Sequence, residues 1–317
     1  MGKALLLRLH RWVALAFALP LLAVILTGVI LSFEPIAVQQ TIRPGSVTVQ
    51  TVEGLLQRYD PQGAARTLFL RPSENTLAIG RGQGGGAVTV DLATGEPVTR
   101  DATTVSDIFG TARQIHERLL LRAGWLVTAS TIAMLSLVVL GVLMGWPRLR
   151  NTLPGWHKGA AWFLLPLVVL SPLTGLLLAL GISFTPDPRT PDPRTPSPRA
   201  ADASGSPLTL AEAVQVLAVE HDLSSLSWIR PLGRTLAARV AEDGEMRTYA
   251  LTREGAVPMA RNWPRLIHEG TWGGLALAVL NLVTSVALLG LLITGIWIWA
   301  RRRLRRASGR QRLAKAA

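Results

Sequence analysis

The sequence contains no cysteine among its 317 residues. Without thiols the chain has no disulfide, no iron–sulfur cluster, no thiolate metal site and no thioether-linked cofactor. Any redox cofactor would have to be held noncovalently by other side chains.

Charge is absent from four long stretches, at residues 12–33, 124–146, 159–184 and 271–300. Each exceeds the roughly 20 apolar residues that a helix needs to cross a bilayer. The composition is 49% hydrophobic and the mean hydropathy is +0.33. We therefore expect four membrane spans. The first ends at Phe33-Glu34-Pro35 without a small-residue cleavage site, which indicates a retained anchor.

Acidic residues are absent from three basic segments. The segment before the first span, the loop between the second and third, and the tail after the fourth carry three, three and eight basic residues. The positive-inside rule places both termini and this loop in the cytoplasm. The net charge of +13 therefore indicates membrane topology and contact with anionic lipid, not nucleic-acid binding.

Two long segments remain for the opposite side of the membrane. The first predicts a helix at 52–59, strands at 67–71, 76–80 and 87–91, and a hairpin turn at 82–86. The second begins with a Pro-Asp-Pro-Arg repeat, an extended tether to about residue 207, and predicts a helix at 208–221 and strands at 228–230, 237–241 and 247–251. We expect each segment to form a small α+β domain.

The order of span, small domain and span occurs twice, which suggests an internal repeat. Thr27-Gly28 and Thr174-Gly175 each follow a histidine, His10 or His157, by 17 positions. The predicted fold is an α-helical membrane protein of four transmembrane helices in an internal two-fold repeat with two small α+β domains. The expected parts are 1–33 (first span), 34–113 (domain 1), 114–147 (second span), 148–158 (cytoplasmic loop), 159–184 (third span), 185–207 (linker), 208–265 (domain 2), 266–300 (fourth span) and 301–317 (basic tail).

Four of the five histidines lie near the starts of the four apolar stretches, and intramembrane ionisable residues usually have a function. Following the chain through the bilayer pairs His10 with His157 at the cytoplasmic face and His116 with His268 at the outer face. Two imidazoles can fill both axial positions of a haem iron, which suits electron transfer. Zinc or copper is disfavoured because each face offers only two histidines.

Cations and glycines flank these histidines. Arg11 and Lys158 adjoin the inner pair, where they could neutralise haem propionates. The corresponding outer candidates are Arg113, Arg118, Arg122 and Arg265. Glycines at 28, 175 and 295 allow a helix or a flat ring to approach closely. Simpler interpretations are interfacial histidines, topology charges and plain helix packing, and we expect His221 to be solvated.

The chain resembles the PepSY-associated transmembrane proteins, also called iron-regulated or iron-uptake membrane proteins. The motifs are Leu9-His10-Arg11-Trp12, Ile115-His116-Glu117, Trp156-His157-Lys158 and Ile267-His268-Glu269-Gly270, each with its following Gly or Thr-Gly. The resemblance implies a bacterial inner-membrane haem protein with periplasmic PepSY modules, some relatives being ferric-siderophore reductases. Leu140-Gly141 departs from the Thr-Gly pattern.

The resulting hypothesis is an inner-membrane conduit with two b-type haems that reduces a periplasmic ferric chelate. Nothing resembles a nicotinamide or flavin site, so a cytoplasmic donor or quinol must supply the electrons. One alternative is a non-catalytic PepSY regulator that inhibits a peptidase or binds a partner. Another is a metal-handling accessory that binds metal but no porphyrin.

Overall fold

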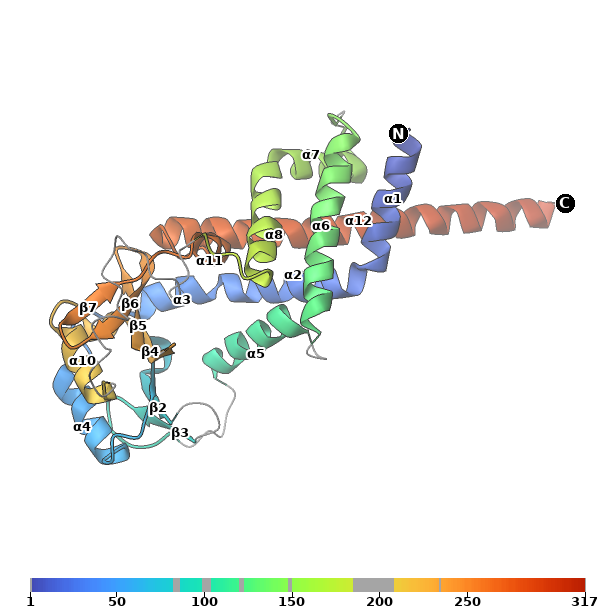
Figure 1. Ribbon diagram of the computed structural model, residues 1–317. Helices are drawn as coiled ribbons and strands as arrows, with labels where there is room; N and C mark the ends of the chain where they lie inside the picture. The colour runs from blue at the N-terminus through green and yellow to red at the C-terminus, as the bar shows by residue number, and fades with distance from the viewer. Residues whose placement is uncertain are drawn as a thin grey trace.

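The computed structural model describes residues 2–81, 86–98, 104–119, 123–147, 150–184, 208–233 and 235–316. Helices form one end of the molecule and a β-sheet forms the other, and both termini lie away from the sheet (Figure 1). The predicted turn at 82–86, except its last residue, and the tether at 186–207 lie outside the described residues.

The four predicted apolar stretches are helical. Their long helices are α2 (Ala18–Ser32), which continues into α3 (Glu34–Thr41), α6 (Gly124–Leu143), α8 (Leu165–Ala179) and α12 (Gly274–Ala316). Among the described residues, three helical stretches are long and apolar enough to cross a membrane, or four if α8 and the helix before it form one bent span. The chain is therefore a helical membrane protein, as predicted.

A shorter helix precedes each span: α1 (Lys3–Ala16), α5 (Val105–Arg118), α7 (Leu153–Phe163) and α11 (Trp263–Glu269). The predicted spans at 12–33 and 159–184 are not single continuous helices, because the first breaks at Phe17 and the second bends by 67° at Leu164. The two break residues share one backbone conformation, φ −100° and ψ 9° against φ −96° and ψ 12°. Pro20 and Pro166 follow the breaks. A proline cannot donate to the carbonyl four residues earlier, which accounts for both breaks.

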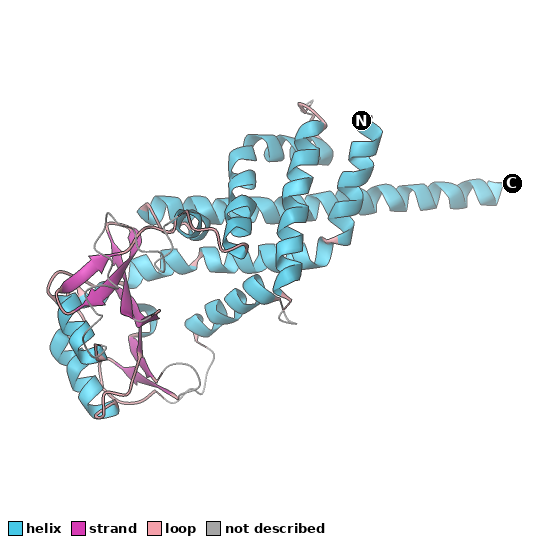
Figure 2. Ribbon diagram, in the orientation of Figure 1, coloured by secondary structure: helices cyan, strands magenta, loops and turns pink. Residues whose placement is uncertain are grey.

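The strands form a sheet at one end of the molecule, drawn in magenta in Figure 2. Among the described residues it has seven antiparallel strands in the order β3-β2-β1-β4-β5-β6-β7. The strands are β1 (Thr67–Arg71), β2 (Thr76–Gly80), β3 (Ala87–Asp91), β4 (Leu226–Leu232), β5 (Thr235–Glu242), β6 (Glu245–Thr252) and β7 (Gly255–Pro258). The six predicted strands are confirmed, the first three with the same bounds, and β7 was missed. Two 3-10 turns, η1 (Pro72–Glu74) and η2 (Leu223–Ser225), precede β2 and β4.

The two segments expected as separate small domains share one sheet and one core. Strand β1 pairs with β4 through Leu68 opposite Ile229 and Phe69 opposite Trp228. Helices α4 (Val49–Tyr59) and α10 (Leu210–Ala218) cover one face, and their buried side chains join those of the strands. Leu217 is fully buried there, and burying such a side chain stabilises the fold by about 2 kcal/mol. Joining the segments also covers two strand edges that would otherwise be exposed.

Candidate functional site

Each of the four span-associated histidines lies on a short helix of its own. His10 lies on α1, His116 on α5, His157 on α7 and His268 on α11. A break separates each of these helices from the long helix that follows it. The histidine is therefore free to pack against a different long helix.

In the first half of the chain, each histidine contacts the long helix that follows the other histidine. His116, which precedes α6, donates from Nδ1 to the carbonyl of Val24 on α2 at 2.9 Å, and the Thr27 hydroxyl lies 3.2 Å from the same nitrogen. His10, which precedes α2, donates from Nδ1 to the carbonyl of Leu137 on α6 at 3.1 Å. Each histidine thus fastens its short helix to the other span of that half.

The second half repeats this exchange. His268, which precedes α12, donates from Nδ1 to the carbonyl of Ser171 on α8 at 3.1 Å, with the Thr174 hydroxyl 3.2 Å away. His157, which precedes α8, has Nδ1 2.8 Å from the hydroxyl of Thr294 on α12. These matched contacts favour the internal repeat, which stays a prediction.

The hydrogen bonds fix the tautomer of all four imidazoles. A carbonyl oxygen can only accept, so Nδ1 carries the proton in His10, His116 and His268. The Thr294 hydroxyl donates to the Gly290 carbonyl at 2.7 Å, so its oxygen accepts from His157. The lone pair of each ring is therefore on Nε2. Metal-bound histidines commonly have this arrangement, with the other ring nitrogen donating to a backbone carbonyl.

Glycines make room for three of the four imidazoles. A Cβ built at Gly28 would lie 3.3 Å from Cε1 of His116, and one at Gly175 would lie 3.0 Å from Cε1 of His268. At Gly295 the corresponding distance to Cε1 of His157 is 3.4 Å. The sequence allowed a helix or a flat ring beside these glycines, and at each of them the nearest side chain is a histidine of a neighbouring helix. At Gly141 nothing lies within 4 Å of such a Cβ.

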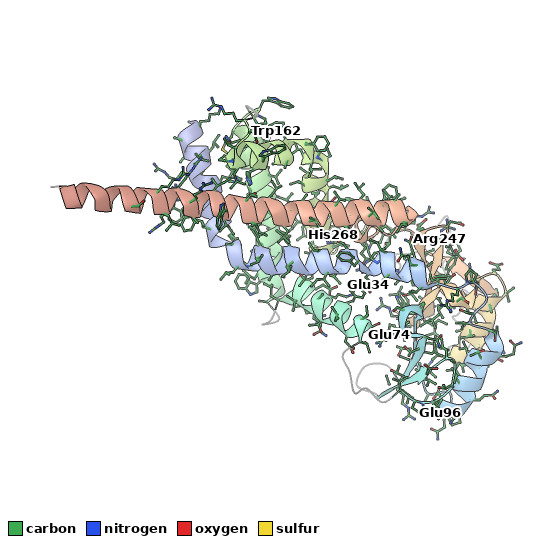
Figure 3. The ribbon with its side chains drawn as sticks, turned by 180° about the vertical axis from the view of Figure 1, so that it is seen from behind. Glu34, Glu74, Glu96, Trp162, Arg247 and His268 are labelled. Atoms are coloured by element: carbon green, nitrogen blue, oxygen red, sulfur yellow. The ribbon has the colours of Figure 1, made fainter. Side chains whose placement is uncertain are left out.

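The structure brings the histidines of the predicted outer pair together. The ring centroids of His116 and His268 are 6.0 Å apart and the ring planes are inclined by 47°. His10 and His157 lie close enough to interact electrostatically. Figure 3 places His268 on the side of the helices nearer the sheet, and Trp162, on the same helix as His157, farther from it.

The separation of the outer pair suits a single iron between the two rings. Two metal–imidazole bonds of about 2 Å, plus roughly 1 Å from each nitrogen to its ring centre, give centroids about 6 Å apart. Among the residues described, no group of three or more His, Cys, Asp and Glu side chains could hold a metal ion. The donor set fits a haem, whose porphyrin supplies the four remaining nitrogens.

Ion pairs surround the outer histidines. Arg113 pairs with Glu34 on α3. Glu269, next to His268, accepts from Arg239 on β5 at 2.9 Å and from Arg265 at 3.2 Å. Burial alone would raise the pKa of Glu269, but the two arginines outweigh it and hold this pKa below its ordinary value. Glu34 lies on the helix that approaches the sheet (Figure 3). The bridge from Arg239 to Glu269 connects the sheet to the helix that carries His268.

The predicted cations differ in their surroundings. Arg113 and Arg265 both bind carboxylates, whereas Arg122 lies outside the described residues. Arg11 and Lys158 are exposed beside the inner histidines, and the Arg11 guanidinium lies 5.7 Å from the centre of the Trp12 ring. Solvent-exposed cations near a membrane end also suit the topological role that the sequence allowed.

His221 is not solvated, so that expectation is wrong. Its side chain is 8% exposed, and Nδ1 contacts the carboxylate of Glu242. The Tyr249 ring lies 4.3 Å from the imidazole, centre to centre, and its hydroxyl donates to Glu242. The helix pattern alone did not reveal this, because the partners lie on strands more than 20 residues later.

Comparison with known families agrees with this architecture. The model of the PepSY-associated TM region matches residues 7–302, which is most of the chain, so the protein belongs to this family. No curated protein sequence matches the chain.

Proposed function

We propose that this protein carries electrons across the bacterial inner membrane and delivers them to a periplasmic ferric chelate. His10 and His157 would hold one haem b near the cytoplasm, and His116 and His268 would hold the other near the periplasm. The observation that carries the proposal is the outer pair: two imidazoles with centroids 6.0 Å apart, each with Nδ1 fixed by a backbone carbonyl.

The chain supplies orientation, because each Nδ1–H bond holds an imidazole with its Nε2 lone pair available. A haem held by two of these histidines would supply a one-electron couple. No side chain has to act as an acid or a base. The protein's task is to hold both rings still, which lowers the cost of reorganisation on electron transfer.

An apolar cluster joins the four long helices α2, α6, α8 and α12, against which the four histidines dock. Its buried members are Leu21, Ile25, Val168 and Leu288, with Phe17 and Leu137 among the side chains packed against them. The Leu137 carbonyl binds the inner His10, and Ile25 follows the residue whose carbonyl binds the outer His116. This dry region would keep water and protons out of the path between the two pairs.

The proposed orientation places both termini in the cytoplasm and the sheet in the periplasm. Both termini lie at the end of the molecule opposite the sheet (Figure 1). The two terminal segments and the loop between the second and third spans carry basic residues and no acidic ones. This charge bias favours a cytoplasmic location for all three. The ferric chelate would therefore meet the outer pair beside the sheet, where one-electron reduction to Fe(II) weakens binding by hard oxygen ligands. A cytoplasmic donor or quinol would reduce the inner pair.

The test is the reduced-minus-oxidised absorption spectrum of the purified protein, with haem quantified per chain. The wild type should contain about two b-type haems, and His10→Ala and His268→Ala should each lose about one. His221→Gln, which changes the fifth histidine, should retain both. A wild type without haem after expression with ample haem would overturn the proposal and favour a non-catalytic regulator.

A further inference from the structure

The sheet has an aromatic and cationic face opposite its hydrophobic core. Phe69 on β1, Trp228 on β4 and Arg239 on β5 are consecutive cross-strand neighbours. Leu68 and Ile229, the next residues along two of these strands, point into the core instead. Arg239 on this face reaches Glu269 on α11. The face carrying Phe69 and Trp228 is therefore turned toward the helices that hold the outer histidines.

Arg230 lies two residues after Trp228 on β4, so its side chain is on the same face of the sheet. Its guanidinium lies over the Trp228 ring at 4.2 Å from the ring centre. Burial, together with the nearby charges of Arg265 and Arg239, lowers the pKa of Arg230. Arg239 and Arg265 share the single carboxylate of Glu269. Arg113 and Glu34 also lie close enough to interact with this group, so four guanidinium groups face two carboxylates. The excess of positive charge favours a bound anion.

We propose that Arg230, Trp228 and Arg265 bind the ferric substrate, and that this substrate is an anionic chelate with aromatic donors, of the tris-catecholate type. Guanidinium groups pair with its charged oxygens, and the faces of Trp228 and Phe69 pack against its rings. An uncharged or cationic tris-hydroxamate chelate offers neither feature. This inference rests on the proposed function, which it deepens by specifying the substrate class.

The position of the site suits delivery of an electron. Arg265 lies three residues before His268 on α11, within one helical turn. Arg239 binds Glu269, the residue that follows His268. A chelate held by Arg230 and Arg265 would therefore lie against the helix that carries one ligand of the outer pair.

Binding is best measured with gallium(III) chelates, because gallium(III) is not reduced and binding is then separated from electron transfer. For the full-length protein in detergent, we expect the trianionic gallium tris-catecholate to quench tryptophan fluorescence and bind more tightly than an uncharged gallium tris-hydroxamate. Arg230→Gln and Trp228→Leu should each weaken tris-catecholate binding about tenfold or more, the scale of a lost charge-assisted contact. Isothermal titration checks the Trp228 variant, whose fluorescence changes.

The matched control is Arg58→Gln. Arg58 also lies over an aromatic ring, that of Tyr59 at 5.2 Å, but it belongs to α4 and pairs with Glu96 at the far end of the sheet region (Figure 3). This variant should bind both chelates as the wild type does. Wild-type affinity for tris-catecholate in Arg230→Gln would overturn the inference.

Haem propionates are a second possible source of the anion. If Arg230→Gln lowers haem content and affects both chelates equally, the arginines serve propionates and the inference is wrong. If instead the protein lacks haem but binds gallium tris-catecholate through Arg230, the substrate site stands and the electron conduit fails.

Discussion

Gly175 leaves little room for a side chain, because a Cβ there would lie 3.0 Å from Cε1 of His268, and the imidazole would have to shift by a few tenths of an ångström. Real Cβ atoms essentially never approach closer than this distance. Gly175→Ala should therefore push the imidazole away from its hydrogen bond to the Ser171 carbonyl. We expect reduced content of the outer haem and a shifted low-spin signal in the electron paramagnetic resonance spectrum.

The other glycines provide graded controls for this prediction. Gly28→Ala, at 3.3 Å from the His116 ring, should disturb the outer haem less, and Gly295→Ala, at 3.4 Å from His157, should hardly change the inner one. Gly141→Ala meets no atom within 4 Å and should leave both haems intact. A loss of haem as large in Gly141→Ala as in Gly175→Ala would refute the steric explanation.

The Thr294 hydroxyl accepts a hydrogen bond from Nδ1 of His157 at 2.8 Å. Thr294→Val should therefore weaken haem retention at the inner pair about tenfold, as for other residues that orient a metal ligand. Haem loss to apomyoglobin, followed spectroscopically, measures this effect. Thr27→Val is the matched control, since His116 keeps the carbonyl of Val24 at 2.9 Å. Equal effects of the two substitutions would show that the carbonyl does not compensate.

Much of the fold could be predicted because its signals are local. Strands β1, β2 and β3 were located to the residue, since alternating apolar residues and short turns determine them. The pairing of β1 with β4 was missed because it joins Phe69 to Trp228, residues far apart in the sequence. Single-strand patterns do not specify which strand edges meet.

The sequence singles out the four histidines of the candidate site, whose role as cofactor ligands stays a prediction, but it does not predict the local architecture around them. The four histidines were found because they recur beside apolar stretches. Their separate helices were not, because Pro20 and Pro166 are also tolerated inside continuous transmembrane helices. The end of α11 at Gly270, where φ is 68°, could be predicted because glycine readily adopts a positive φ. The end of α5 could not, because Leu119 adopts φ 52° there and leucine gives no such signal.

His221 is predicted to stabilise the sheet and to have no influence on the haems. His221→Ala removes a nearly buried contact to Glu242 and leaves a gap beside Tyr249. The free energy of unfolding of the sheet should fall by about 2 kcal/mol, which denaturant titration followed by tryptophan fluorescence can measure. The haem spectrum should not change. Retained stability would mean that solvent replaces the contact at no cost.

The ion pair between Arg239 and Glu269 should stabilise the junction between the sheet and helix α11. Their side chains are 17% and 20% exposed. Arg239→Gln, which leaves Arg265 as the one described ion-pair partner of Glu269, should destabilise the junction by about 3 kcal/mol. Hydrogen exchange of the backbone amides in β5 and α11 measures this locally. The double variant with Glu269→Gln should lose less than the sum of the single losses, because the two groups interact.

The sign of the pH dependence of this stability follows from the lowered pKa of Glu269. The folded protein holds this carboxylate ionised at pH values where the unfolded chain already binds a proton. Its contribution is therefore complete above the ordinary glutamate pKa of about 4.3 and is lost as pH falls through the lower folded value. Glu269→Gln should be less protected at pH 7 and should lack this acid-dependent loss. If protection falls as steeply with decreasing pH in Glu269→Gln as in the wild type, another carboxylate causes the acid sensitivity.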